Sequence, residues 1–226
     1  MTFSMMRSNL KEKPNFAKAY MKANEILATS RVIETFPFSS LALVKEQSDI
    51  PCRSYAKARK YGVNMYDFGS ESAVIMKYGA KAIIFYDETK PKAHINFSIL
   101  HELGHPINNH IFSSDDNKYG RYEIETNYFA AQLLMPDQLL REFQKRGQRI
   151  TTPFLMESFG VSELAATKRI STLSKVNCDW YSRDERQYDD IILEKYSSFI
   201  NSFCPVVDIY NYEEELEIQR ERDSWY

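Results

Sequence analysis

The sequence predicts an α+β protein in which helices dominate and a small sheet occupies one segment of the chain. Glycine is scarce, with 7 among 226 residues against a usual share of about 7%, which argues against a turn-dense all-β design. Apolar residues recur at helical spacing through most of the chain. Residues 72–86 differ, because there the apolar runs are short, rich in β-branched and aromatic residues, and interrupted by Gly79.

The elements before residue 90 follow from this change of period. An amphipathic stripe predicts a helix over residues 15–29, and residues 41–61 predict one or two shorter helices interrupted at 49–51. Residues 72–78 and 80–86 predict a β-hairpin that turns at Gly79, before a polar connection over residues 87–92.

The second half of the chain returns to helical spacing at Ala93. We expect a helix through residues 95–110 and another over 121–135 that ends at Pro136. A further helix over 136–146 stops at Gly147, and two short helices follow within 150–173, the second capped by Ser162.

The composition excludes several classes of protein. With 29 basic and 31 acidic residues, the net charge of -2 leaves no broad basic surface for nucleic acid. The longest apolar runs, such as residues 82–86, fall far short of the roughly 20 residues that span a bilayer. No secretory signal is recognisable, and three widely spaced cysteines without a C-x-x-C pair predict reduced thiols. We therefore expect a globular, cytoplasmic protein without a membrane partner.

The motif that carries chemistry is His101-Glu102-Leu103-Gly104-His105, an H-E-x-x-H pattern. On a helix its histidines lie one turn apart on one face, where both can bind one Zn2+. Glu102 then projects beside the metal and can take a proton from the attacking water. The chain has 4 histidines in all, so this pairing is difficult to attribute to chance.

A catalytic zinc site needs a third protein ligand, and no third-histidine pattern follows His105. Glu123 and Glu125 are the candidates. At about 100° per residue, Glu123 falls nearer than Glu125 to the centre of the apolar stripe of its helix. We favour Glu123 and keep Glu125 as the alternative. Asn127, one turn after Glu123, is placed to orient a ligand.

Three segments together resemble the ImmA/IrrE family of metallopeptidases: residues 96–105, residues 123–136 and residues 159–170. We divide the chain into a zincin-like peptidase domain over residues 1–146 and a helical C-terminal extension over residues 147–226, which holds a helix-turn-helix-like pair and an acidic tail. The resemblance itself spans roughly residues 80–175 and implies a compact fold of helices around a roughly three-stranded sheet. It also implies one Zn2+, held by His101, His105 and Glu123, with Glu102 as the catalytic residue. The implied activity is zinc-dependent endopeptidase cleavage of a helix-turn-helix repressor of a phage, mobile element or stress regulon.

A second hypothesis is a regulatory DNA- or protein-binding module whose zinc site is structural or inactive. Lys168, Arg169 and Lys175 give the last predicted helix a basic edge, although so few charges make direct nucleic-acid binding an unfavoured expectation. Two further features concern the site. Pro106, which crowds the carbonyl of Glu102, should kink or end the motif helix. His94 and His110 are available as oxyanion donors, but we favour His110 as a surface or supporting residue.

Overall fold

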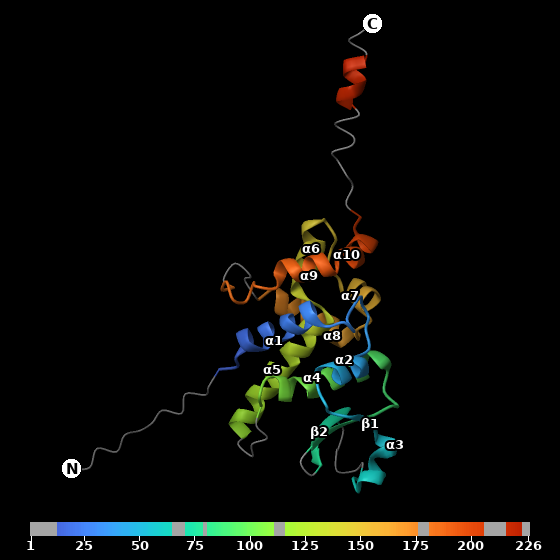
Figure 1. Cartoon of the computed structure of the whole chain (residues 1–226), viewed down its shortest axis with the longest axis vertical. Helices are drawn as coiled ribbons and strands as arrows, with labels where there is room; N and C mark the ends of the chain where they lie inside the picture. The colour runs from blue at the N-terminus through green and yellow to red at the C-terminus, as the bar shows by residue number, and fades with distance from the viewer. Residues whose placement is uncertain are drawn as a thin grey trace, which may run out of the picture.

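The computed structural model describes residues 13–64, 71–78, 81–110, 116–175, 181–205 and 216–222, which form a helical molecule with a small sheet at one end (Figure 1). This confirms the predicted mostly helical α+β class. The labelled helices are α1 (Phe16–Thr29), α2 (Ser40–Gln47), α3 (Tyr55–Ala58), α4 (Lys92–Ile107), α5 (Asp116–Leu134), α6 (Asp137–Lys145), α7 (Thr152–Phe159), α8 (Glu163–Leu173), α9 (Asp189–Lys195) and α10 (Ser197–Phe203), with a 3-10 turn η1 (Arg59–Tyr61).

The helices begin and end where local chemistry predicts. The side chain of Asn15 accepts a hydrogen bond from the backbone amide of Lys18 at the start of α1, and the side chain of Ser162 caps α8 in the same way. Gly147 and Gly160 follow α6 and α7 with positive φ angles of 87° and 63°, which only glycine adopts freely. Helix α5 begins at Asp116, five residues before the predicted start at Arg121, because its first turn is too polar to show an apolar stripe.

The sheet in the described residues has three strands in the order β1-β3-β2. Strands β2 (Ala73–Tyr78) and β3 (Lys81–Tyr86) are the predicted antiparallel pair, with Ile75 opposite Ile84. Strand β1 (Cys52–Ser54) runs parallel to β3 and falls in a segment predicted to be helical, so that prediction was wrong there. Three residues, two of them polar, are too few to show strand alternation.

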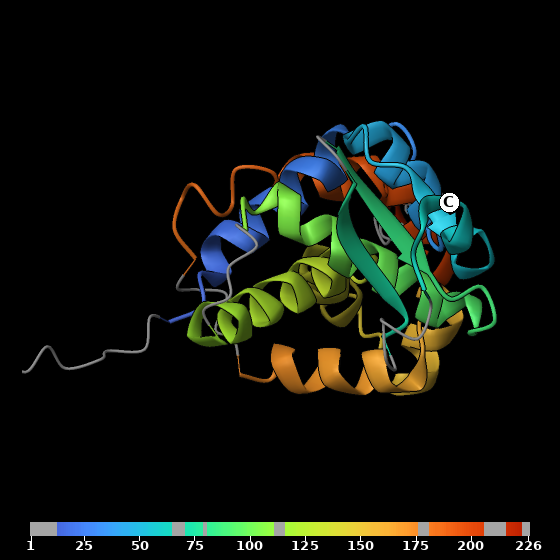
Figure 2. The ribbon, with the colours of Figure 1, turned by 90° about the horizontal axis from the view of Figure 1, so that it is seen from below.

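One hydrophobic core joins both parts of the predicted domain division at residue 146. Leu100 and Phe129 from α4 and α5 belong to the same buried cluster as Phe159, Tyr196 and Ile200 from the C-terminal part. Figure 2 shows α5 with α8 beside it. Helix α4 packs against α5 and also contacts strands β2 and β3 of the sheet. The boundary between a peptidase domain over 1–146 and an extension over 147–226 stays a prediction.

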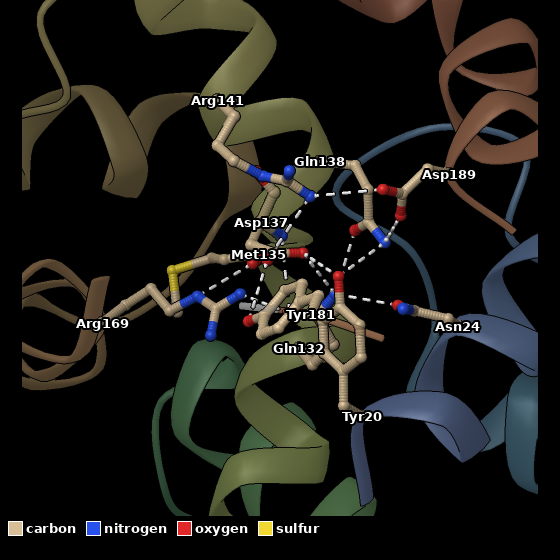
Figure 3. A network of polar contacts seen from close by, with 10 residues as sticks. All are labelled: Tyr20, Asn24, Gln132, Met135, Asp137, Gln138, Arg141, Arg169, Tyr181 and Asp189. Atoms are coloured by element: carbon tan, nitrogen blue, oxygen red, sulfur yellow. Dashed lines mark hydrogen bonds and ion pairs between the residues drawn. The ribbon is translucent and has the colours of Figure 1, made fainter. Parts of the chain in front are cut away.

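A buried polar network also connects the two parts (Figure 3). Arg169 of α8 is 2% exposed and donates to the amide oxygen of Gln132 on α5. The amide nitrogen of Gln132 in turn donates to Asn24 of α1 at 2.9 Å, and Gln138 of α6 donates to Asp189 of α9 at 2.9 Å. Buried polar groups are costly unless they are paired, so these bonds fix how α8 and α9 pack on the core.

Two predictions from composition can be compared with the described residues. None of the helices in the described ranges has the length and apolar character needed to span a bilayer. Cys52 and Cys204 are free thiols, and burial raises the pKa of Cys52 to about 11, which keeps it protonated at neutral pH. Cys178 lies outside the described residues.

Candidate metal centre

Helices α4 and α5 bring together the three side chains that the sequence singled out. The Nε2 atom of His101 lies 3.0 Å from Oε2 of Glu123, and Nε2 of His105 lies 3.4 Å from Oε1 of the same carboxylate. All three candidate ligand atoms lie within 4.8 Å of one another. A tetrahedral zinc ion with bonds of about 2.05 Å separates its ligand atoms by about 3.3 Å. The two nitrogens and the carboxylate therefore have the chemistry and spacing that such an ion needs.

The close approach of α4 to α5 depends on Gly104, which lies inside the motif. A Cβ atom at this position would lie 3.0 Å from the Phe129 ring and 3.1 Å from the methyl group of Thr126, both on α5. Both distances are shorter than ordinary carbon contacts. Glycine at position 104 thus allows the helix of the two histidines to approach the helix of Glu123.

Asn127 holds the ring of His101. Its Oδ1 atom lies 3.1 Å from Nδ1 of His101, on the side of the ring away from Glu123. An amide oxygen only accepts hydrogen bonds, so Nδ1 carries a proton, and Nε2, which faces the carboxylate, is the ring atom that a metal ion would bind. Asn127 therefore orients a candidate ligand, as its position on the helix predicts, and the ligand that it touches is His101.

His105 is held by a different device, which begins at Pro106. Helix α4 contains Pro106 and ends one residue later, at Ile107, which is three residues before the expected limit at residue 110. Asn109 then takes a left-handed conformation with φ 57°. The amide of Asn109 donates to Pro106 and that of His110 donates to His105, the bond pattern of a Schellman turn. The turn folds the His110 ring back under the ring of His105.

The side chain of His110 connects His105 to a buried carboxylate. Nδ1 of His110 lies 3.3 Å from Nδ1 of His105, and Nε2 of His110 lies 2.8 Å from Oε2 of Glu125. Because the carboxylate accepts from Nε2, Nδ1 of His110 is the acceptor and Nδ1 of His105 is the donor. This arrangement leaves Nε2 of His105 free to face Glu123. With both nitrogens engaged, His110 supports a candidate ligand and does not point toward a substrate.

Glu125, the alternative third ligand, lies away from the cluster. It is 4% exposed, and its second oxygen accepts the amide of Asn15 at 2.7 Å, at the start of α1. The structure thus places Glu123 with the histidines, but not for the reason that the stripe suggested. Glu125 is nearer the middle of the buried face, because polar Gln132 widens that face, and Glu123 stands at its edge, 29% exposed.

Glu102 lies beside the cluster and is held by the sheet. Its Oε2 atom accepts the backbone amide of Ile75 in the edge strand β2 at 2.9 Å, a contact that the sequence did not predict. Burial is the strongest influence on this carboxyl and raises its pKa, while His101 and His105 oppose the rise. A carboxylate with a raised pKa is a better proton acceptor near neutral pH than an exposed one.

The candidate ligands perturb one another in the expected directions. Burial acts to raise the pKa of Glu123, but hydrogen bonds from His101 and His105 outweigh it and hold this pKa well below its usual range. Burial acts to lower the pKa of His101, but Glu123 and Glu102 raise it overall. The negative charge of Glu123 thus stabilises the positive charge of His101, and the reverse also holds. A bound metal cation would supply the same positive charge next to the Glu123 carboxylate.

Two imidazoles one turn apart, a carboxylate from the next helix and a second carboxylate beside them define a candidate metal site of the zinc metallopeptidase class. A family model described as the IrrE N-terminal-like domain, of the Peptidase M78 family, matches residues 57–171, just over half of the chain. The chain therefore belongs to the ImmA/IrrE metallopeptidase family. A search of curated proteins found no match.

Proposed function

We propose that this protein is a zinc-dependent endopeptidase, with His101, His105 and Glu123 as the metal ligands and Glu102 as the catalytic residue. The observation that carries the proposal is the triangle of ligand atoms with the half-buried carboxylate of Glu102 next to it. Membership of the M78 peptidase family supports the same activity. A zinc ion in this position supplies a Lewis acid that polarises the scissile carbonyl and acidifies water.

The side chains of the site have separate roles in peptide hydrolysis. Glu102 accepts the proton that the attacking water loses and delivers it to the leaving amine. The amide of Ile75 holds one oxygen of Glu102, so that the carboxylate keeps its position while the proton moves. Asn127 and His110 hold the imidazoles in the tautomers that turn Nε2 toward Glu123.

The proposed substrate is a helix-turn-helix transcriptional repressor, as the resemblance to the ImmA/IrrE family implies. A near-neutral enzyme with a net charge of -2 has no strong field to steer a partner. Recognition of such a repressor must therefore come from a shaped surface near the metal site.

The experiment is a cleavage assay with purified helix-turn-helix proteins encoded next to this chain. Wild-type protein loaded with zinc should cut one of them at a defined bond, which mass spectrometry identifies. The Glu102→Gln variant should keep its zinc and lose at least about 100-fold in rate. Glu157→Gln, which changes an exposed carboxylate on α7, is the matched control and should cleave normally. Full cleavage by Glu102→Gln would overturn the proposed role.

The DNA-binding alternative receives less support from helix α8. Arg169, which formed part of its expected basic edge, is buried and bonded to Gln132 and to the carbonyl of Met135. Lys168 on this helix and Lys175 just after it remain exposed. Two exposed lysines give little affinity for phosphates, so we favour a packing role for α8 over a recognition role.

A further inference from the structure

A cavity of about 440 Å³ lies between α4, α5, α8 and the start of α1. Figure 2 shows α8 running alongside α5 on this side of the molecule. The walls of the cavity are mainly apolar and include Phe97 of α4, Ile124 and Tyr128 of α5, and Leu164 and Ala165 of α8. We refer to this cavity as the α5/α8 groove. Its volume falls within the range of pockets that hold small ligands or side chains.

The α5/α8 groove adjoins the candidate metal centre. Asn127 lines the groove and also contacts His101, and Ile124 follows the candidate ligand Glu123 in the chain. Phe97 lies one turn before His101 on α4. A peptide whose scissile bond lies at the metal centre therefore has a neighbouring side chain within reach of the groove.

Large apolar side chains from three helices stay exposed around this groove. Leu164 is 65% exposed, Ile124 is 47% exposed and Phe16 is 46% exposed. Single exposed apolar residues are common, but a group of them around a cavity marks a surface that another molecule covers. These three residues come from α8, α5 and α1, so the fold and not the sequence of one helix brings them together.

The groove continues beyond the first cavity. A second cavity of about 350 Å³ shares Phe16, Tyr128 and Thr172 with it and extends to Tyr181. Lys168 lines the first cavity and is exposed, while Lys175 and Glu185 both line the second. The first cavity therefore suits a segment with bulky apolar side chains and an acidic residue close to them.

From these observations we propose that the α5/α8 groove is the specificity pocket of the peptidase. It holds a bulky apolar side chain, such as leucine or phenylalanine, next to the scissile bond of the protein substrate. The inference rests on the proposed endopeptidase function and names a substrate class for it. Burial of one such side chain favours the bound peptide by a factor of about 10 to 100 over a peptide with serine or glycine there.

The test uses full-length, zinc-loaded protein and a set of fluorogenic peptides. The peptides differ at the positions flanking the cleaved bond, which carry leucine, phenylalanine, serine or glycine. Wild-type protein should show a kcat/KM about tenfold or more higher for leucine or phenylalanine. Leu164→Asp should lose most of this preference, and Leu164→Met should retain it. Ile191→Asp, a similarly exposed change on α9, is the control and should behave as wild type.

Failure of this inference can be distinguished from failure of the proposed function. Cleavage by wild type with no preference, or an unchanged preference in Leu164→Asp, overturns the specificity pocket and leaves the peptidase in place. If no peptide is cut, fluorescence anisotropy measures binding of the same peptides to the Glu102→Gln variant. Binding that requires leucine or phenylalanine and is lost on adding Leu164→Asp supports the groove even then, and absent or unselective binding overturns it.

A competing occupant of the groove is a second copy of this chain. Sedimentation velocity over a range of concentrations measures the oligomeric state of wild type and Leu164→Asp. We expect the same monomeric sedimentation coefficient for both. A wild-type dimer that Leu164→Asp dissociates would overturn the specificity pocket, because the groove would then be covered by the second copy.

Discussion

The contact between His110 and His105 leads to a quantitative prediction about zinc affinity. With zinc bound to Nε2 of His105, its Nδ1 carries a proton and needs an acceptor, which Nδ1 of His110 supplies at 3.3 Å. His110→Leu removes that acceptor and keeps an apolar side chain under the ring. His105 is 9% exposed, so water replaces the lost partner poorly.

The size of the effect follows from the cost of an unpaired buried donor, about 1–3 kcal/mol. At about 1.4 kcal/mol per factor of ten, the Kd for zinc should rise about 5- to 150-fold in His110→Leu. Competition with a chromophoric chelator measures this Kd directly. Glu125→Gln should cost less, because an amide oxygen still accepts from Nε2 of His110.

His94→Leu is the matched control, since His94 is an exposed histidine on the same helix. It should bind zinc as wild type does. Thermal unfolding of the zinc-free variants shows whether each one folds. A folded His110→Leu variant with wild-type affinity would refute the role of the His110 ring, as would equal weakening in His94→Leu.

The remaining predictions concern stability. Gly104→Ala should lower the free energy of unfolding by about 1–3 kcal/mol, because its methyl group would meet the Phe129 ring at 3.0 Å; an unchanged denaturation midpoint would argue against this close packing. Zinc at about 1,000 times its Kd should stabilise wild type by about 4 kcal/mol and Glu123→Gln much less, as measured by calorimetry with and without a chelator. Equal stabilisation of wild type and Glu123→Gln by zinc would show that Glu123 is not a ligand. Burial acts to raise the pKa of Glu46, but hydrogen bonds from Ser30 and nearby amides lower it overall, so this carboxylate stabilises the fold above the unfolded pKa of about 4.3 and loses that contribution as pH falls through its folded pKa. Wild type should therefore lose more stability than Glu46→Gln in urea titrations at about pH 3 relative to about pH 6, and parallel losses would contradict the shift.

The helices were predictable because their signals are local. An apolar stripe and a cap residue define α1 and α8, and both end within a residue of the predicted positions. Strand β1 was not predictable in this way. Its three residues pair with β3, which lies about thirty residues later, and nothing in the local pattern of Cys52, Arg53 and Ser54 records that partner.

In the candidate site, too, the local features were predictable from the sequence and the contacts between distant segments were less so. His101, Glu102 and His105 form a local motif, so their spacing alone predicts that they share a helix face. The choice of Glu123 over Glu125 depended on which carboxylate faces α4, and the apolar stripe misjudged the buried face because a polar residue, Gln132, belongs to it. The favoured residue was nevertheless the one beside the histidines.

The supporting contacts were beyond single-sequence reasoning. His110 was predicted to be a surface or supporting residue, and its ring lies buried against His105. The one local sign was the Pro106-Ile107-Asn108-Asn109 segment, where a proline followed by an asparagine able to adopt a left-handed conformation favours a tight helix end. The contact of Glu102 with Ile75 depends on how the sheet packs on α4, and no local sequence pattern predicts that packing.

X-ray absorption at the zinc edge tests the proposed metal centre most directly. The zinc-loaded protein should show nitrogen and oxygen ligands alone, at about 2.0–2.1 Å, with the scattering pattern of two imidazoles. Glu123→Gln should change this spectrum and weaken binding, while Glu125→Gln should leave the ligand distances unchanged. A sulfur ligand at about 2.3 Å, or a wild-type spectrum in Glu123→Gln, would contradict a site built from His101, His105 and Glu123.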